Sequence, residues 1–421
     1  MNADETQLCQ GKRKLGCSDE EKQNVELYIP AEIYFKHFLK LPVKSLLACK
    51  CVCKTWHALI SNPDFVKKQL DLTIQRNKPH LMLHGFKFDY RGKHRNVFYS
   101  IDHDSLELLL SKDRFREYAV QIDYPFKSLG YSVELMGTCD GLVCLWFNAK
   151  RKRFFCIWNP ATREYKVLPK SNNKHPNENN KYRVGMAAFG YNYKSNDYKL
   201  IAGFYDGLFE VYSLRSNSWK TIRYLSFELP YEFNISEPSG VLVNGVHHWL
   251  ARNQESHDIV IVSLDITNKK FYELNLPKEP LEKDLEFRNL GVLEGCLCLF
   301  VVNIGCVEVW VMQDYGVQES WTKRYITNDE TIVKEYMSLM WSFKSGEILL
   351  GGASIGLNLY YPENDMRAKP NINSRSTYLY KGVCYSQSLV SLASGTYVGR
   401  EEPIEKSDAG VLGKRGKTTR N

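Results

Sequence analysis

The chain of 421 residues is longer than a single hydrophobic core usually supports, so its length predicts two or more domains. Hydrophobic residues make up 43% of the chain and charged residues 25%, which are ordinary values for a globular protein with a packed core. The formal net charge of +8 comes from 56 basic and 48 acidic residues spread along the whole length, which does not predict a nucleic-acid partner.

The two ends of the chain predict tails. Residues 1–27 and 399–421 are charged and poor in aromatic side chains, so we expect disorder in both. The first fifteen residues carry acids and Gln where a secretory signal would place an apolar segment. We therefore expect the chain in the cytoplasm, the nucleus or both, with its twelve cysteines as thiols.

Residues 28–72 predict a compact helical unit. Pro30 suits the start of a first helix, and Pro42 ends that helix and starts a second. A third helix is predicted from Val52, Trp56 and Leu59 at helical spacing, and Asn62-Pro63-Asp64 predicts the start of a short fourth helix. A unit of this size buries little apolar surface alone, so we expect its apolar excess to be covered by the rest of the chain or by another protein.

Three potential metal ligands fall in the same segment. Cys49, Cys53 and His57 are spaced at i, i+4 and i+8, which would place them along one helix face. Three ligands in a line cannot close a tetrahedral site, and no second ligand pair completes them. We therefore expect no metal here.

Three separated blocks of residues 28 to about 70 resemble the F-box of plant F-box proteins. They read Ile29-Pro30-x-Glu32, Leu41-Pro42-Val43-Lys44-Ser45-Leu46 and Cys51-Val52-Cys53-Lys54-x-Trp56-x-x-Leu59-Ile60. The resemblance implies docking on a Skp-type adaptor and, through it, on the cullin and RING subunits of a ubiquitin ligase. By position, the implied adaptor-binding residues are Ile29, Pro30, Phe38, Leu41, Pro42, Leu46, Val52 and Trp56.

Two features bear on that docking. Lys36 and His37 stand where the family usually has an acid followed by Ile, and a His buried at an adaptor interface would have to be neutral and hydrogen-bonded. Residues 28–72 contain seven Lys against three acids, a surplus that would steer an acidic partner toward this unit.

Beyond residue 75 the sequence predicts a repeated β-structure. Hairpins closed by a dipeptide ending in Gly and outer strands carrying an aromatic residue both recur at intervals of about fifty residues, which is typical of propeller blades. The turn markers are Asp140-Gly141, Asn244-Gly245, Glu294-Gly295 and Ser345-Gly346, and the aromatic markers are Tyr165, Trp219, Phe271 and Trp321. We expect a ring of five to seven blades, in which the last strands close against the first and a degenerate blade covers residues 80–110. The apolar stretch 295–312 is then a pair of strands and not a membrane span.

The same region resembles the F-box-associated domain, a kelch-like propeller, in segments such as CDGLVCL, IWNPATREYKVLP and VLVNGVHHWLA. The predicted fold is therefore a small all-α N-terminal F-box unit (28–72) followed by a mainly antiparallel all-β kelch-like β-propeller (80–398). In that family the propeller recruits the protein to be ubiquitinated.

Catalysis is not predicted. Gly352-x-Ser354-x-Gly356 matches a nucleophile elbow, but the segment after it reads as a strand instead of the helix that an elbow needs. His247 and His248 are adjacent in a strand and face opposite sides, so they cannot share one role.

We therefore predict a substrate-recruiting subunit of a Skp-cullin-F-box ubiquitin ligase, without catalytic residues, cofactor, nucleic-acid partner or membrane partner. Two alternatives stay open, namely a stand-alone propeller adaptor outside any ligase and a propeller-based hydrolase. Contacts with the target are expected from loops and exposed aromatic residues on one propeller face, which the sequence does not identify.

Overall fold

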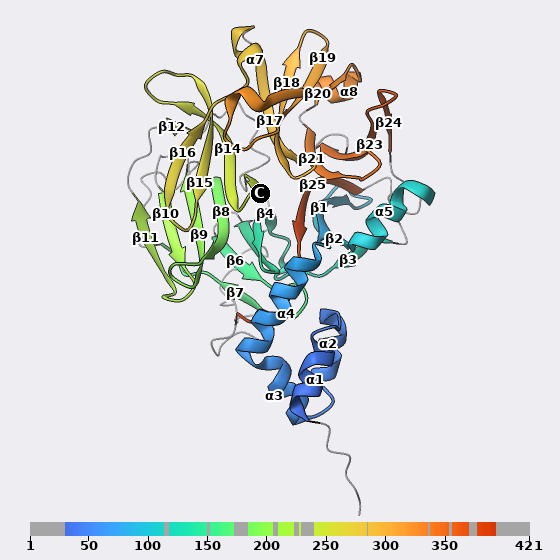
Figure 1. Ribbon diagram of the computed structural model, residues 1–421, viewed down its shortest axis with the longest axis vertical. Coiled ribbons are helices and arrows are strands. Elements are labelled where there is room, and N and C mark those ends of the chain that lie inside the picture. The colour runs from blue at the N-terminus through green and yellow to red at the C-terminus, as the bar shows by residue number, and fades with distance from the viewer. Residues whose placement is uncertain are drawn as a thin grey trace, which may run out of the picture.

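The computed structural model places a helical unit beside a ring of β-sheets (Figure 1). It describes residues 30–112, 118–149, 152–171, 184–204, 209–222, 227–228, 240–283, 285–335, 337–352, 356–369 and 377–392. The predicted tails and the implied docking residue Ile29 lie outside these ranges. No helix within the described ranges is long and apolar enough to cross a membrane.

Four helices form the helical unit. They are α1 (Ala31–Phe38), α2 (Val43–Lys50), α3 (Lys54–Ser61) and α4 (Pro63–Arg76). Pro30 and Pro42 stand immediately before α1 and α2, and the Asn62 side chain caps α4 by accepting from the amide of Asp64 at 2.8 Å. The predicted helix starts are therefore confirmed.

Two predictions about this unit are wrong. The fourth helix is not short, because its 14 residues run on to Arg76. Val52 is not part of the third helix, since extended Cys53 caps α3 and leaves Val52 in the preceding turn. The same break places Cys49 on α2 and His57 on α3, so the three potential metal ligands do not share a helix.

The described strands form six antiparallel sheets arranged as the blades of a propeller. Blade 1 consists of β25 (Thr377–Tyr385), β1 (His80–Phe88), β2 (His94–Ile101) and β3 (Val120–Ile122), blade 2 of β4 (Ser132–Cys139), β5 (Leu142–Ala149), β6 (Lys152–Trp158) and β7 (Tyr165–Val167), and blade 3 of β8 (Val184–Asn192), β9 (Asp197–Phe204), β10 (Phe209–Ser213) and β11 (Ser218–Ile222). Blade 4 consists of β12 (Phe227–Glu228), β13 (Val241–Val243), β14 (Val246–Asn253), β15 (Ile259–Asp265) and β16 (Lys270–Leu274), blade 5 of β17 (Glu286–Leu293), β18 (Cys296–Asn303), β19 (Cys306–Met312) and β20 (Trp321–Thr327), and blade 6 of β21 (Met337–Ser342), β22 (Ile348–Gly352), β23 (Gly356–Tyr361) and β24 (Met366–Ala368).

Short helices connect some of these strands. They are α5 (His103–Lys112), α7 (Lys278–Glu282), α8 (Glu330–Lys334) and the 3₁₀ turns η1 (Lys127–Leu129) and η2 (Gln318–Ser320). Part of the segment predicted as a degenerate blade at 80–110 is the helix α5. Asp102 starts this helix by accepting from the amide and hydroxyl of Ser105 at 2.9 and 2.6 Å.

The turns between the first two strands of the blades follow the predicted pattern with one exception. Asp140-Gly141, Asn244-Gly245 and Glu294-Gly295 all have positive φ at both residues, as a two-residue hairpin turn of type I′ requires. Ser345-Gly346 does not, because β21 ends at Ser342 and β22 begins at Ile348, which leaves a wider loop. That turn prediction is wrong.

The ring closes by pairing the last strand with the first, as predicted. β25 pairs with β1 from His80↔Tyr385 to Lys87↔Thr377, with a bulge between His84 and Gly85. A Cβ at Gly85 would lie 1.9 Å from the Tyr378 carbonyl oxygen, so only Gly allows the two strands to approach here.

The propeller core is divided among the contacts between neighbouring blades. Six apolar clusters of the described residues each lie between two consecutive blades, for example the one in which Phe98 of β2 packs edge-on against Trp158 of β6 with centroids 6.4 Å apart. Outer-strand indoles add links between blades, since Nε1 of Trp219 donates to the Pro169 carbonyl at 2.7 Å and Nε1 of Trp321 to that of Asn275 at 3.0 Å. Each blade is therefore stabilised by both of its neighbours.

Candidate functional site

The helical unit has a small aromatic core of its own. Phe38, Leu46, Ile60 and Phe65 are buried at 5% exposure or less. The ring of Trp56 packs edge-on against Phe38 with centroids 4.9 Å apart. These side chains hold the helices together, so a partner can reach them only at their edges.

The implied adaptor-binding residues separate by exposure. Pro30, Pro42 and Val52 are exposed, Val52 at 64%. Leu41 and Trp56 are half-buried, whereas Phe38 and Leu46 lie inside the core of the unit. The structure brings the described members of the set into one unit and presents three of them to solvent.

The uncovered part of the unit extends beyond that set. Ile33 on α1 is 45% exposed, and it was not among the implied docking residues. Lys36 and His37 on the same helix are exposed, so His37 is not buried within the chain itself. The exposed apolar side chains of the helical unit, together with these basic side chains, are called its open surface below.

The propeller covers another part of the unit through residues 386–392, which we call the strap. Leu389 of the strap is 2% exposed and belongs to the same apolar cluster as Phe38 and Leu46, with Ala161 packed beside it. Of the two covers expected for the unit's apolar excess, the rest of the chain therefore supplies one at Leu389, whereas Val52 stays exposed.

Hydrogen bonds hold the strap against blade 2. The amide of Asn159, in the turn between β6 and β7, donates to the carbonyls of Ser388 and Val390 at 3.2 and 2.7 Å. The Ser388 hydroxyl donates to the Asp140 carbonyl, and a Cβ on Gly141 would lie 2.4 Å from that hydroxyl oxygen. The turn at residues 140–141 therefore needs Gly both for its φ of +81° and for the passage of the strap.

Charged groups also meet where the unit joins the ring. Glu164 accepts from the hydroxyl of Ser391 and the amide of Leu392, both at 2.8 Å. Burial lowers the pKa of Lys50 on α2, and the Glu164 carboxylate opposes that shift. The turn that holds the strap therefore also faces the helical unit with a negative charge.

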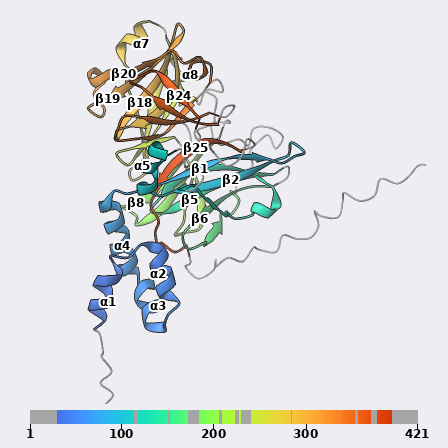
Figure 2. The ribbon, with the colours of Figure 1, turned by 90° about the vertical axis from the view of Figure 1, so that its right-hand side faces the viewer.

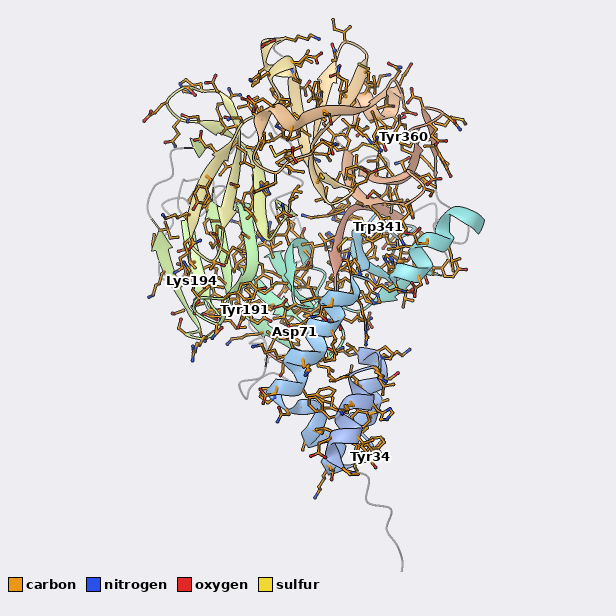
Figure 3. The ribbon with its side chains drawn as sticks, in the orientation of Figure 1. Tyr34, Asp71, Tyr191, Lys194, Trp341 and Tyr360 are labelled. Carbon is orange, nitrogen blue, oxygen red and sulfur yellow. The ribbon has the colours of Figure 1, made fainter. Side chains whose placement is uncertain are left out.

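The helix α4 forms a second connection. Its Arg76 guanidinium donates to the Leu39 carbonyl within the unit at 3.2 Å. Between α4 and β1, Lys78 forms an ion pair with Asp104 of α5 at 2.7 Å, which connects the end of α4 to the ring. Figure 3 shows Asp71 where α4 meets the ring and Tyr34 at the far end of the unit. Burial raises the pKa of Asp140, and the Asp71 carboxylate raises it further, so α4 contributes charge to this joint.

The structure describes two of the candidate catalytic groups, His247 and His248. Ser354 lies outside the described residues, and the chain continues from there into the strand β23. Burial lowers the pKa of His248 to about 4, and its neutral ring donates to the Val241 carbonyl at 3.2 Å and accepts from the Tyr315 hydroxyl at 2.7 Å. His247 is buried and stacks on Trp249. In the described part of the chain, no group of three or more His, Cys, Asp or Glu residues could hold a metal ion.

Comparisons with known proteins agree with the two parts of the fold. The family model of the F-box domain matches residues 38–68, and that of the F-box associated beta propeller domain matches residues 96–392. F-box protein CPR1 of Arabidopsis thaliana is 29% identical over 331 residues, which cover 73% of this chain and 75% of that protein. The F-box/kelch-repeat protein At3g23880 of the same plant is 26% identical over 366 residues, covering 83% of this chain and 92% of that protein.

Proposed function

Since this chain belongs to the plant F-box proteins that carry an F-box-associated β-propeller, we propose that it is the substrate-recruiting subunit of a Skp-cullin-F-box ubiquitin ligase. The two domains support a substrate-adaptor role in ligases of this type. The proposal goes further and assigns the helical unit to a Skp-type adaptor, and through it to the cullin and RING subunits. It assigns the propeller to a protein target that is ubiquitinated.

The open surface of the helical unit is the observation that carries the proposal. Val52 and Ile33 are large apolar side chains at 64% and 45% exposure in a chain that buries most others of their kind. We assign adaptor binding to the exposed Pro30, Pro42 and Val52, with Leu41 and Trp56 at the edges. Ile29 is assigned by the sequence resemblance alone. Phe38 and Leu46 would act by fixing the shape of this surface from below.

The proposed mechanism is one of positioning. The strap attaches the helical unit to blade 2, and α4 leads directly into β1 of blade 1, so the adaptor and the target would be held at a defined separation. A target presented in this way would meet activated ubiquitin at a high effective concentration, and the chemistry would belong to other subunits. The proposed location is the cytoplasm, the nucleus or both, without a nucleic-acid or membrane partner.

Binding of purified Skp-type adaptor to the whole chain tests the proposal. Val52→Lys places a charge on the open surface without disturbing the core, and we expect its affinity for the adaptor to fall at least about tenfold. Ile304→Lys is the matched control, because Ile304 is 99% exposed in the turn between β18 and β19 of blade 5. Equal binding by both variants would contradict the proposed surface.

A stand-alone propeller adaptor is the second candidate. The exposed Lys36 and His37 favour it, because they replace the family's usual acid and Ile. If wild-type chain fails to bind any Skp-type adaptor while Lys36→Glu/His37→Ile restores binding, the stand-alone function replaces the ligase function.

A further inference from the structure

Among the central hairpins of the blades, basic residues are concentrated on two adjacent blades. In each blade the second and third strands form a hairpin, which is β1–β2 in blade 1 and β5–β6 in blade 2. The β1–β2 hairpin, residues 80–101, contains four Lys or Arg residues and one acid, and the β5–β6 hairpin, residues 142–158, contains four and no acid.

The equivalent hairpins of the other blades have no such excess. β9–β10 and β14–β15 each contain one basic and three acidic residues. β18–β19 contains a single acid, and β22–β23 contains no charged residue. The net charge of the whole chain is modest, but the net charge of these hairpins changes from positive in blades 1 and 2 to negative in blades 3 and 4.

The basic side chains of the β1–β2 hairpin are exposed to a partner. They are Lys87, Arg91, Lys93 and Arg95, all of them exposed, and none forms an ion pair within the part of the chain that the structure describes. The one acid of this hairpin, Asp89, accepts from the amides of Arg91 and Lys93 at 2.9 Å each, so its carboxylate is already bound to the turn. In blade 2, Lys152 is exposed, while Lys150 and Arg151 lie outside the described residues.

Aromatic side chains accompany these charges. On the side of the β1–β2 hairpin that faces blade 2, Phe88 is 37% exposed and packs edge-on against Tyr378 of β25 with centroids 5.6 Å apart. The Phe86 ring is tilted by 30° against the Tyr380 ring, with centroids 5.0 Å apart. At the tip, Tyr90 is 88% exposed beneath the Arg91 guanidinium, which lies 5.1 Å from the ring centroid.

The two basic hairpins are joined at this end of the ring. The amide of Asn96 on β2 donates to the carbonyl of Tyr131 at 3.1 Å, just before β4 of blade 2. The Tyr131 ring packs on Phe154 of β6 at 6.1 Å, and Nζ of Lys152 lies 5.7 Å from the centroid of Phe154. Lys152 therefore lies beside the aromatic side chains between the two blades, and Arg91 lies beside Tyr90 at the tip of the β1–β2 hairpin. Lys87 and Arg95 pair across the same hairpin on its other side, which faces blade 6.

This surface lies away from the helical unit. The unit packs on Ala161 after β6, and Asp71 of α4 acts electrostatically on Asp140 before β5. Both positions are at the opposite ends of β5 and β6 from Lys152. A strand of eight residues such as β5 is about 26 Å long, which sets the separation of the two ends. Figure 2 shows the β1–β2 hairpin extending away from α4.

From this arrangement we infer that blades 1 and 2 form a docking surface for an acidic polypeptide segment that also carries aromatic or other apolar side chains. The inference rests on the proposed function, of which it specifies the target class and the propeller face. Exposed Lys and Arg steer and pair with carboxylates, and the aromatic side chains provide apolar contact and cation–π pairing at the centre. A nucleic acid fits less well, because its continuous backbone charge would run from these blades onto the acidic hairpins of blades 3 and 4.

Fluorescence anisotropy with a labelled peptide of Glu, Asp, Phe and Gly tests this inference on the whole chain. We expect saturable binding that weakens with added salt, and a loss of at least about tenfold in affinity for Arg91→Glu/Lys93→Glu. The matched control is Lys269→Glu/Lys270→Glu, a double reversal at exposed positions of the β15–β16 turn in blade 4, which should bind as the wild type does. Tyr90→Ala should weaken binding without any change of charge.

Three results would overturn the inference. They are equal binding by the two double variants, equal binding of a peptide in which Lys replaces Glu and Asp, and tighter binding of a single-stranded RNA than of the acidic peptide. Adaptor binding is measured on the same preparations. If Arg91→Glu/Lys93→Glu keeps both adaptor and acidic peptide, this docking surface is wrong and the proposed ligase function stands.

Discussion

The helical unit and the blades bury their apolar side chains in different ways. Each blade packs against two similar blades, and an apolar cluster lies between each pair of neighbours around the ring. The helical unit has no such neighbour, and it completes its core with Leu389, which lies more than three hundred residues away in sequence. The helical unit is too small to bury all of its apolar surface by itself. Leu389 covers part of that surface, while Val52 and Ile33 stay exposed and can bind a partner.

Opening the ring should have the largest effect. Gly85→Val would place a side chain where the Tyr378 carbonyl oxygen lies 1.9 Å from the Cβ, so β1 and β25 could not pair. We expect a loss of about 3 kcal/mol or more in the free energy of unfolding, measured by chemical denaturation. Gly316→Asn is the control, since nothing lies within 4 Å of its Cβ and Asn tolerates the φ of +83°. A ring that keeps its stability with Val at position 85 would contradict the closure.

Removing the strap's anchor should affect the helical unit more than the blades. Leu389→Ala deletes a fully buried side chain and should cost about 2–3 kcal/mol of stability. Hydrogen exchange should quicken in α1–α4 while β14, β15 and β18 keep their protection. Leu129→Ala, at a position that is 39% exposed, should change stability by less than about 0.5 kcal/mol. Faster exchange spread equally over all blades would show that Leu389 does not act on the helical unit specifically.

The smallest effect is expected from the charges at the joint. Because the folded-state pKa of Asp140 is raised by burial and then by Asp71, this group makes the folded state less stable as pH rises above its unfolded pKa of about 3.9. Asp71→Asn removes part of that penalty, so the variant should be more stable than the wild type at pH 7 by about 0.5 kcal/mol. The two should converge as the pH falls below about 3.9, and exposed Glu282→Gln should show no such difference. Denaturation curves at several pH values measure this difference. A wild type that is more stable than Asp71→Asn at pH 7 would contradict the predicted destabilising effect of the Asp71 charge.

The sequence predicted the propeller because its signals are local and repeated. A two-residue turn such as Asn244-Gly245 needs positive φ, so its residue type reveals its conformation wherever it recurs. Ser345-Gly346 carries the same residue signal, but its strands end further apart and the loop is wider. The helix α5 was missed although Asp102 followed by Ser105 is a capping signal, because the segment was assigned to a degenerate blade.

The site was predicted less completely because its decisive contacts are distant. A helical pattern shows that Leu46, Val52 and Trp56 are apolar, but not which of them faces a core and which faces a partner. Nothing local to residues 386–392 indicates that Leu389 packs under α1 and α2, since that contact depends on where the ring places its last strand. The basic hairpins of blades 1 and 2 are visible as residue types, yet their meeting on one end of the ring follows only from the blade order.

Hydrogen–deuterium exchange of the whole chain, with and without the Skp-type adaptor, tests the central claim most directly. We predict that backbone amides near Ile33 and Val52 exchange faster in the free chain and become protected with adaptor, while the strap is protected in both states. Protection around Val52 already present in the free chain, or adaptor-induced protection confined to the blades, would contradict the account.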